Sequence, residues 1–352
     1  MSYRKAFVHV SLPILRSHAP RPAPEVDRLE ALATATPPRS VRLSLTDRCD
    51  LACVYCRPHK RDGYFERPLD LDAWKTIVRG LVQAGVRRVR LTGGEPLLYG
   101  RVVEVIRFLG ELGLGDLALT TNATRLAKLA KPLREAGLMR VNISLDTLDA
   151  ERFARITRGG DLAPVLAGVD AALEAGFDEI KLNAVVVRGE NDDELARIVE
   201  WSWDRGIVPR LLEVMQIGEG AKLAHRVVSA TEMRERLGDL IEDEAAVGER
   251  DRGPAKYVRA RDRADRKVGF ITGTTDTYCD GCDRLRVASD GTLRPCLATE
   301  DGVGAAASAR AGDADGVSEA LREAWAQKPD GKAWKGCTEP SAARISMRQI
   351  GG

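Results

Sequence analysis

The fold of this chain is decided by the stretch Val41-Arg42-Leu43-Ser44-Leu45-Thr46-Asp47-Arg48-Cys49-Asp50-Leu51-Ala52-Cys53-Val54-Tyr55-Cys56. An apolar run of β-forming residues ends here in three cysteines with the spacing Cys49-x3-Cys53-x2-Cys56. Three thiolates inside one loop can bind three irons of a cubane iron–sulfur cluster. The remaining iron then has no protein ligand, so a substrate or a cofactor can bind it directly. We therefore predict an open [4Fe-4S] cluster in the loop that follows the first strand.

A zinc site, or a group of unrelated buried cysteines, is the alternative interpretation of this loop. Zinc motifs usually carry paired Cys-x2-Cys units that add up to four ligands. No further cysteine lies nearby, and His59 is the only close histidine. The spacing instead resembles that of the radical S-adenosylmethionine (SAM) superfamily, in which the amino and carboxyl groups of SAM chelate the open iron. The aromatic residue between the last two cysteines, Tyr55, fits the same pattern.

Beyond this loop, short β-branched runs alternate with amphipathic helical patterns. Strands are expected at residues 41–45, 89–92, 117–121, 140–144, 180–187 and 208–215, and helices at 71–84, 102–112, 126–136, 162–175 and 193–203. A glycine closely follows each expected helix and can adopt the left-handed conformation that ends it. The alternation predicts parallel βα units that curl into an incomplete α/β barrel, with the site at the C-terminal ends of the strands.

Local composition divides the chain into three parts. Residues 1–40 are rich in proline, and we expect a lead-in segment with one short helix near residues 25–33. Residues 41–218 are expected to form the partial barrel with the first cluster. Residues 219–352 begin with a charged, less regular stretch, continue through a second cysteine motif and a helical stretch at 314–328, and end in two glycines. We expect this C-terminal region to close the barrel.

The overall composition excludes several classes of function. Of the 352 residues, 44% are hydrophobic and 30% are charged, as in ordinary globular proteins. A net charge of +2 and an aromatic content of 5% argue against a nucleic-acid or anionic-membrane partner. No apolar run approaches the roughly 18 residues of a membrane span. Because the cysteines cluster in two motifs, we expect metal ligation in a reducing compartment, the cytoplasm.

A second cysteine motif, Cys279-x2-Cys282-x13-Cys296, supplies three more thiolates. A three-cysteine zinc site completed by a distant residue is the alternative. Cys337 is the only cysteine outside the two motifs, and its surroundings indicate a lone structural thiol. We therefore predict a second open cluster, whose free iron could act as a Lewis acid toward a substrate nitrogen or oxygen.

Two arginines follow this motif at alternate positions of a β-like run, so Arg284 and Arg286 should share one face. A pair of solvated surface arginines is the alternative. Beside a metal site, two guanidinium groups indicate an anionic substrate, since Arg binds phosphate in a bidentate manner. The chain has no G-x-x-x-x-G-K-[ST] loop, so a nucleotide triphosphate would be held by cationic side chains.

Polar residues gather at the expected strand ends. The turn Gly93-Gly94-Glu95 lets a ligand approach the backbone, and Glu95 could accept a hydrogen bond from an ammonium group. Other polar groups follow later strands within residues 120–122, 142–146, 181–183 and 213–215. Each alone is compatible with a helix cap or a solvated rim. Together they place hydrogen-bonding groups around one barrel mouth.

These residues together resemble the GTP 3',8-cyclases, the radical SAM enzymes that open molybdenum cofactor biosynthesis. The resemblance covers residues 41–352 and includes both cysteine motifs, the Gly-Gly-Glu turn and the stretches 119–122, 137–149, 156–160, 181–183, 188–194 and 210–218. The second cluster, the Arg-x-Arg pair and the terminal Gly-Gly are together typical of this family. The resemblance implies an incomplete (β/α)6 radical SAM barrel closed by a C-terminal region that carries a second cluster.

The resemblance also implies roles for individual residues. Two [4Fe-4S] clusters would be held by Cys49, Cys53 and Cys56 and by Cys279, Cys282 and Cys296. SAM would contact Tyr55, Gly94, Ser144 and Met215. GTP would contact Arg42, Arg90, Thr120, Lys181, Arg210, Arg284 and Arg286. The expected catalytic residues are Arg42, Arg284, Arg286, Gly351 and Gly352, the last two because a tail without side chains can enter a narrow channel.

The implied reaction begins with reductive cleavage of SAM to methionine and a 5'-deoxyadenosyl radical. This radical removes the ribose 3' hydrogen of GTP, and the sugar radical attacks guanine C8. The implied product is (8S)-3',8-cyclo-7,8-dihydroguanosine 5'-triphosphate. The implied partners are an electron donor such as a flavodoxin or ferredoxin, cyclic pyranopterin monophosphate synthase as recipient of the product, and a second copy of the chain in a homodimer.

Some positions depart from the family pattern and leave room for a paralogue with another substrate. Ala123 stands where Gly is usual, Arg88 where Lys is usual, Arg57 where Met is typical and Asp50 where Asn is typical. A radical SAM enzyme with an auxiliary cluster that modifies a peptide or another small molecule is the main rival. It explains both cysteine motifs but not the set of cationic residues. A non-catalytic iron–sulfur or zinc-binding interaction protein would not need the polar strand ends.

Overall fold

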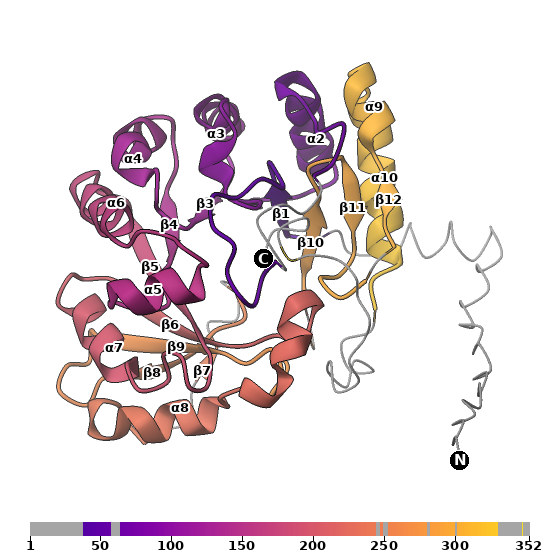
Figure 1. Cartoon of the computed structure of the whole chain (residues 1–352). Helices are drawn as coiled ribbons and strands as arrows, with labels where there is room; N and C mark the ends of the chain where they lie inside the picture. The colour runs from indigo at the N-terminus through magenta and orange to yellow at the C-terminus, as the bar shows by residue number, and fades with distance from the viewer. Residues whose placement is uncertain are drawn as a thin grey trace, which may run out of the picture.

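The computed structural model describes residues 38–57, 64–243, 247–248, 253–279, 282–299, 301–329 and 347. Over these residues the strands form one continuous twelve-stranded sheet that curves, with helices packed along its outer side (Figure 1). The helix expected near residues 25–33, Cys337, Gly351 and Gly352 lie outside the described residues.

Six strands form the parallel centre of the sheet. They are β1 (Ser40–Ser44), β2 (Arg88–Thr92), β3 (Asp116–Thr121), β4 (Arg140–Ser144), β5 (Glu179–Val186) and β6 (Val208–Glu213), each paired in parallel with the next. The helices that connect them include α2 (Leu71–Gln83), α3 (Val102–Glu111), α4 (Leu126–Glu135), α6 (Ala163–Glu174) and α7 (Leu195–Trp203). The strands and helices expected from the alternation of patterns are therefore confirmed, with ends shifted by one or two residues.

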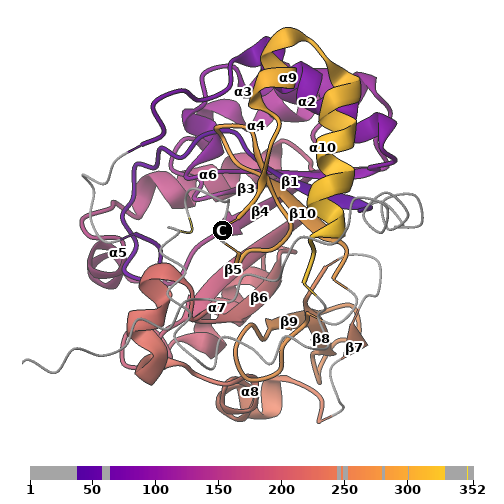
Figure 2. The same ribbon diagram turned by 90° about the vertical axis from the view of Figure 1, so that its right-hand side faces the viewer.

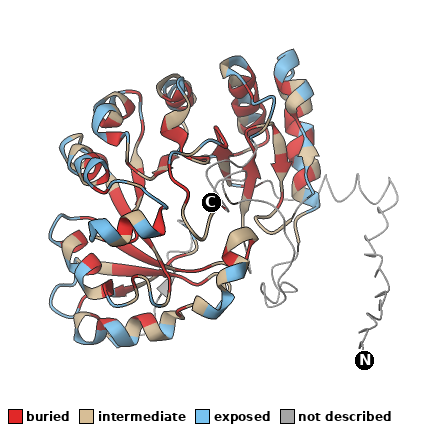
Figure 3. Ribbon diagram, in the orientation of Figure 1, coloured by how far each residue is buried: buried red, intermediate tan, exposed pale blue. Residues whose placement is uncertain are grey.

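The core lies between this sheet and the helices, which turn their apolar sides inward (Figure 3). On α2, Trp74, Ile77 and Leu81 are fully buried, three and four residues apart along the chain. They belong to the same core as the buried strand residues Leu43 and Leu91. Burial of one such side chain contributes about 1.5–3 kcal/mol to the stability of the fold. Apolar residues at helical spacing therefore predict which side of a helix faces the core.

The C-terminal region extends both edges of the sheet. At one edge β10 (Arg284–Val287) pairs in parallel with β1, and β11 (Thr292–Arg294) and β12 (Val303–Gly304) follow. At the other edge β9 (Lys267–Ile271) pairs in parallel with β6, and β8 (Lys256–Arg259) and β7 (Val247–Gly248) follow.

The incomplete barrel expected from the sequence is confirmed, but the C-terminal region does not close it through strand pairing. Among the described strands, β12 and β7 end the sheet at opposite edges. The physical reason is that β1 and β6 each receive a separate C-terminal strand, which satisfies the backbone groups that would otherwise pair across the gap.

Several short elements were not expected from the sequence. They are the helices α5 (Ala150–Ile156), α8 (Ala230–Leu237) and α9 (Ala306–Ala311), and the 3-10 turns η1 (Pro96–Leu98), η2 (Gly218–Arg226) and η3 (Gly238–Leu240). The expected C-terminal helix is α10 (Ala314–Ala326), which lies beside α2 (Figure 2). A Cβ on Gly80 of α2 would lie only 2.6 Å from the Ala314 carbonyl oxygen, so the two helices pack closely. No described helix has both the length and the apolar character that a membrane crossing needs.

Ion pairs join the N-terminal ends of several strands. At the start of β4, Arg140 donates to Asp116 on β3 (Nε–Oδ1 2.8 Å) and to Glu179 on β5 (Nη1–Oε2 3.1 Å). At the start of β2, Arg88 pairs with Asp283, which precedes β10 (2.5 Å). These pairs lie at the opposite end of the sheet from the first cysteine loop, which follows the C-terminal end of β1.

Candidate active site between two cysteine loops

The first cysteine loop, residues 49–56, leaves β1 and packs against the end of α5. Two backbone amides of the loop donate hydrogen bonds to the carbonyls of Ile156 and Thr157, at 3.0 and 3.2 Å. Arg158 then donates from Nη1 to the carbonyl oxygen of Arg57, just past the loop (2.5 Å). The end of α5 therefore sets the position of the loop, although no sequence pattern predicted this helix.

The three thiols of this loop form no disulfide, are partly buried and lie close enough to affect one another. Burial, and then the Glu95 carboxyl, raise the pKa of Cys49 to about 12. Burial, and then Asp146, also raise the pKa of Cys53 well above its ordinary value. A bound metal deprotonates such thiols outright. Three clustered, desolvated thiols in one loop therefore fit an iron–sulfur cluster.

A single metal ion would need a tighter arrangement. Within the part of the chain that the structure describes, no three His, Cys, Asp or Glu side chains converge as one ion requires. In a cubane cluster each cysteine binds a different iron. The fit of both cysteine triads rests instead on clustered, partly buried thiols that form no disulfide.

The glycine-rich turn after β2 lies against the first cysteine loop. A Cβ on Gly94 would lie 2.2 Å from the carbonyl oxygen of Arg48, so only glycine fits here. The amides of Gly94 and Glu95 donate to the carbonyls of Thr46 and Arg48, at 2.6 and 2.7 Å. The turn and the loop are therefore held together by their backbones.

The Glu95 carboxylate is engaged within the protein. It accepts hydrogen bonds from the Thr121 hydroxyl (2.7 Å) and from the backbone amides of Asn122 (2.7 Å) and Leu97 (3.0 Å). Burial raises its pKa to about 7. The sequence suggested Glu95 as a hydrogen-bond acceptor for the ammonium group of a ligand. In the structure its hydrogen bonds to Thr121 and Asn122 join the ends of β2 and β3.

Tyr55 of the first cysteine loop is tied to the end of β4. Its hydroxyl donates to Asp146 Oδ2 (2.7 Å), and Asp146 Oδ1 accepts from the backbone amide of Val185 on β5 (2.8 Å). The Asn191 side chain donates to the Asp146 carbonyl oxygen (2.7 Å). Burial raises the pKa of Asp146 to about 6 and the pKa of Tyr55 well above its usual value. The strand-end pattern pointed to Asp146 as one polar group among several, and the structure identifies its partner.

A row of arginines crosses the sheet between the two cysteine loops. Arg286 on β10, Arg42 on β1 and Arg90 on β2 are direct partners in the strand register. Burial, and then the charge of Arg286, lower the pKa of Arg42 well below its ordinary value. Burial also lowers the pKa of Arg90 to about 9 and that of Arg286 to about 10. Partly desolvated cations aligned in this way are suited to binding an anion.

Lys181 on β5 and Arg210 on β6 add two buried cations to the site. Lys181 Nζ lies 3.1 Å from a Glu179 carboxylate oxygen and donates to the Tyr257 hydroxyl (3.2 Å). Arg210 donates to Asn142 Oδ1 (2.5 Å). Sequence reasoning missed Tyr257, because no local signal marks it: β8 reaches the site only by pairing with β9.

The second cysteine loop, defined as the segments around β10 and β11 that carry Cys279, Cys282 and Cys296, shares a cavity with Met215, which follows β6. The cavity, of about 60 Å³, is lined by residues that include Met215, Cys279, Cys282, Arg284, Arg286 and Cys296. The Tyr278 hydroxyl contacts Met215 Sδ (3.7 Å), and the Arg284 guanidinium lies 4.8 Å from the centre of the Tyr278 ring. Arg284 Nε also donates to Cys282 Sγ (3.3 Å). The structure thus brings Met215, expected at SAM, next to the arginines expected at the substrate.

The remaining expected residues lie around this centre. Thr120 and Ser144 lie at the C-terminal ends of β3 and β4, and the first cysteine loop follows the C-terminal end of β1, so all three are at the same end of the parallel strands. Ala123, which replaces a usual glycine, is buried with φ of 63°, in the left-handed region that favours glycine. Arg57 is also buried, and its Nη1 reaches the carbonyl oxygen of Cys49 (3.3 Å).

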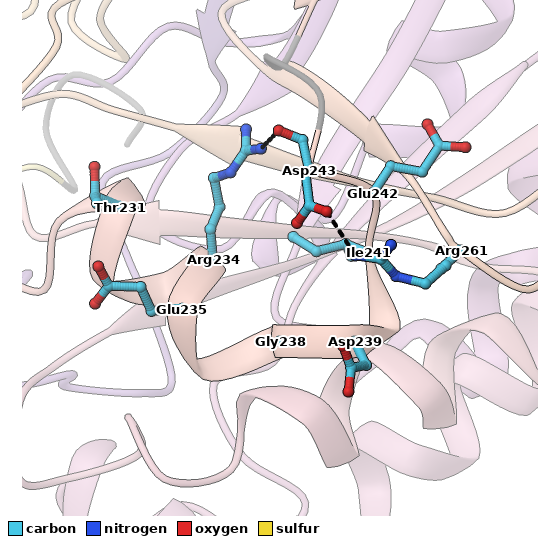
Figure 4. A pocket seen from close by; sticks show the side chains of 9 residues that line it. All are labelled: Thr231, Arg234, Glu235, Gly238, Asp239, Ile241, Glu242, Asp243 and Arg261. Atoms are coloured by element: carbon cyan, nitrogen blue, oxygen red, sulfur yellow. Dashed lines mark hydrogen bonds and ion pairs between the residues drawn. The ribbon is translucent and has the colours of Figure 1, made fainter.

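A larger cavity of about 590 Å³ lies elsewhere, at the end of α8 (Figure 4). Its lining is charged and comes from α8, η3 and the residues around them. Two of its arginines, Arg234 and Arg261, already bond to Asp243, at 3.3 and 3.2 Å. It shares no residue with the cavity between the cysteines, and we place the chemistry at the smaller cavity because the cysteines and buried cations lie there.

Comparisons with known proteins agree with this geometry. Residues 43–202 match the Radical SAM superfamily, and residues 207–334 match Molybdenum Cofactor Synthesis C. The GTP 3',8-cyclase of Pelotomaculum thermopropionicum is 40% identical over 327 residues, which cover 89% of this chain and 97% of that protein. The GTP 3',8-cyclase of Paracoccus denitrificans is 39% identical, with 90% and 94% covered.

Among solved structures, Streptococcus suis SuiB bound to the precursor peptide SuiA has a TM-score of 0.61 at 16% identity. The match covers 92% of this chain and 79% of that one. SuiB bound to S-adenosylmethionine gives a TM-score of 0.59 at 16% identity, with 92% and 80% covered. At this identity the likeness concerns the fold alone.

Proposed function

Because this chain belongs to the GTP 3',8-cyclase family of radical SAM enzymes, we propose that it converts GTP to (8S)-3',8-cyclo-7,8-dihydroguanosine 5'-triphosphate between its two cysteine loops. Such an enzyme uses SAM and two [4Fe-4S] clusters. We assign the first cluster to Cys49, Cys53 and Cys56 and the second to Cys279, Cys282 and Cys296.

Residues around the first cysteine loop form the proposed SAM site. When bound, the first cluster supplies the electron that cleaves SAM. Gly94 lets its turn pack directly against the carbonyl of Arg48, which holds the turn beside the first cysteine loop, and Tyr55 is held in place by its hydrogen bond to Asp146. Ser144, at the end of β4, and Met215, in the cavity of the second loop, complete the SAM contacts in this proposal.

The single structural observation that most supports GTP as the substrate is the row formed by Arg286, Arg42 and Arg90. Burial lowers the pKa of all three, and the charges of Arg286 and Arg90 lower the pKa of Arg42 further. A triphosphate would neutralise them, and guanidinium groups match phosphate oxygens in a bidentate manner. Further contacts in this proposal come from Thr120, Lys181, Arg210 and Arg284.

The first three of the proposed catalytic residues, Arg42, Arg284 and Arg286, hold substrate beside the second cysteine loop. Each side chain lies on β1 or β10, neighbouring strands in the sheet. Their role is to orient the ribose C3' and guanine C8 toward each other and toward SAM. Gly351 and Gly352 are proposed to enter the same site, because two residues without side chains fit a narrow channel.

The rival function is modification of a peptide by a radical SAM enzyme with an auxiliary cluster. The fold likeness to SuiB bound to a precursor peptide favours this rival, but at 16% identity it concerns the fold alone. The partly buried arginine row argues for a small polyanion instead, since a neutral peptide would leave these cations unneutralised.

Anaerobic incubation of the reconstituted protein with SAM, GTP and dithionite tests the proposal. We expect 5'-deoxyadenosine and the cyclic nucleotide to form together, and an iron content of about eight per chain for two cubanes. Arg42→Ala should abolish the cyclic product, whereas the matched control Arg87→Ala, at an exposed residue, should not. Formation of 5'-deoxyadenosine without consumption of GTP would refute the cyclase function and leave the radical chemistry intact.

The biological setting is proposed from the family. A flavodoxin or ferredoxin would donate electrons, cyclic pyranopterin monophosphate synthase would take the product, and the enzyme would work in the cytoplasm, in keeping with its two cysteine triads.

We also propose a homodimer, and a division into a lead-in segment (1–40), a radical SAM part (41–218) and a C-terminal part (219–352). Size-exclusion chromatography with light scattering checks the dimer.

A further inference from the structure

A lysine just beyond α10 reaches into the second cysteine loop. Lys328 Nζ donates to the carbonyl oxygen of Arg284 (2.8 Å) and to that of Pro295 (2.9 Å). Arg284 comes two residues after Cys282, and Pro295 directly precedes Cys296. One side chain therefore joins the two segments that carry these cysteines, which thirteen residues separate in the sequence.

The position of Lys328 is itself well anchored. Its ammonium group lies 5.2 Å from the ring centre of Trp325, one helical turn earlier, and Trp325 packs against the main core. The same helix, α10, packs closely on α2 at Gly80. Lys328 thus connects the second cysteine loop to a rigid pair of helices that belongs to neither cysteine motif.

The ammonium group is also part of the cavity wall. Lys328 lines the same cavity as Cys279, Cys282 and Cys296. Its two carbonyl acceptors belong to the segments that carry Cys282 and Cys296, so its positive charge lies at the second cysteine loop.

We propose that Lys328 is a positioning residue of the second iron–sulfur site, which holds the segments of Cys282 and Cys296 at the spacing that a cluster needs and makes that cluster easier to reduce. The electrostatic part follows because an added electron makes a cluster more negative, and a nearby cation stabilises that state; net charge and hydrogen bonding set the potentials of such clusters. The inference rests on the proposed second cluster, but not on GTP as the substrate.

Redox titration monitored by electron paramagnetic resonance tests this role without measuring turnover. The full chain carrying Cys49→Ser, Cys53→Ser and Cys56→Ser can form only the second cluster, so its signal is unambiguous. In this background we expect Lys328→Met to lower the midpoint potential. A tenfold fall in the ratio of reduced to oxidised cluster at a fixed potential corresponds to about 59 mV for one electron. Lys328→Arg, which keeps the charge, should restore most of the potential.

Arg322→Met is the matched control, because Arg322 is an exposed cation on α10 itself. It should change neither the potential nor the iron content. Loss of iron from the second site in Lys328→Met, with normal iron in Arg322→Met, would support the positioning role. An unchanged potential in fully loaded Lys328→Met would overturn the electrostatic role, and equal iron loss in Arg322→Met would overturn the positioning role. If Lys328→Met shows the potential shift but the wild-type protein does not consume GTP, only the proposed function fails.

Discussion

The two cysteine loops have the same number of cysteines but opposite electrostatic surroundings. Around the first loop lie carboxyl groups, Glu95 and Asp146, which raise the pKa of its thiols together with burial. Around the second loop lie Arg284 and Lys328, which bring the pKa of Cys282 below its ordinary value. SAM carries a sulfonium and an ammonium group, whereas GTP carries a triphosphate. In the proposed site, the charges beside each loop would therefore favour a cationic cofactor at the first loop and an anionic substrate at the second.

The largest effects should come from removing one cysteine of either loop. Cys53→Ser and Cys282→Ser should each lower the iron content from about eight to about four per chain. Cys53→Ser should abolish cleavage of SAM, because it destroys the site where SAM binds. Cys282→Ser should retain 5'-deoxyadenosine formation while losing the cyclic product. Iron assays and chromatography of 5'-deoxyadenosine and the cyclic nucleotide measure these effects. If the two variants behaved alike, the proposed difference between the loops would be wrong.

Removing one arginine beside the second loop should separate substrate binding from cluster binding. Arg286→Ala should raise the KM for GTP by about 10- to 100-fold, since a hydrogen bond to a charged group contributes about 1.5–3 kcal/mol. Its iron content should stay normal. Arg284→Ala should also lower iron at the second site, because Arg284 Nε donates to Cys282 Sγ. Steady-state kinetics with iron analysis decides this, and iron loss in Arg286→Ala would contradict it.

Loss of the hydrogen bond between Tyr55 and Asp146 should weaken the binding of SAM but not the binding of GTP. Tyr55→Phe and Asp146→Asn should each weaken SAM binding by about 5- to 30-fold, the effect of 1–2 kcal/mol. Because both changes remove the same 2.7 Å bond, the double variant should bind SAM no more weakly than either single variant. Equilibrium binding of SAM under anaerobic conditions measures all three, and additive losses would argue against this bond.

A smaller effect is expected at the far wall of the cationic site. Tyr257→Phe removes the hydroxyl that accepts a hydrogen bond from Lys181. We expect the KM for GTP to rise about 3- to 10-fold, in line with 0.5–1.5 kcal/mol for one hydrogen bond. Binding of SAM should be unaltered, which a parallel titration checks. A change in SAM binding alone would place Tyr257 with the first loop instead.

The smallest effect is expected for Ala123→Gly, next to the first loop. Glycine would relieve the left-handed backbone of Ala123, which costs about 1–2 kcal/mol. The substitution would also remove the contact of the Ala123 methyl group with Gly168 on α6, worth about 0.8 kcal/mol. In addition, glycine would raise the conformational entropy of the unfolded chain and so lower stability. The free energy of unfolding should therefore change by less than about 1 kcal/mol, with normal activity, as chemical denaturation and assays would show.

Sequence reasoning placed the parallel strands and their connecting helices, because apolar periodicity and glycine ends are local signals. It also selected the cysteines and the arginine pair of β10, whose spacing along the chain is short. It did not find Tyr257 or Lys328, since each reaches the site from an element that carries no motif. It also expected the C-terminal region to close the barrel, whereas β9 and β10 extend opposite edges of the sheet.

The amino-acid sequence by itself determined the two cysteine triads, the α/β alternation and the supply of cationic residues, because these depend on residue type and on short spacings. Only the tertiary structure decided which cations meet. The register that aligns Arg286, Arg42 and Arg90 comes from pairing between β10, β1 and β2, strands that lie far apart in the chain. That pairing adds Arg42 and Arg90 to the arginines that follow Cys282 in the sequence, and packing at the ends of β2 and β4 brings the carboxyl groups of Glu95 and Asp146 to the first loop.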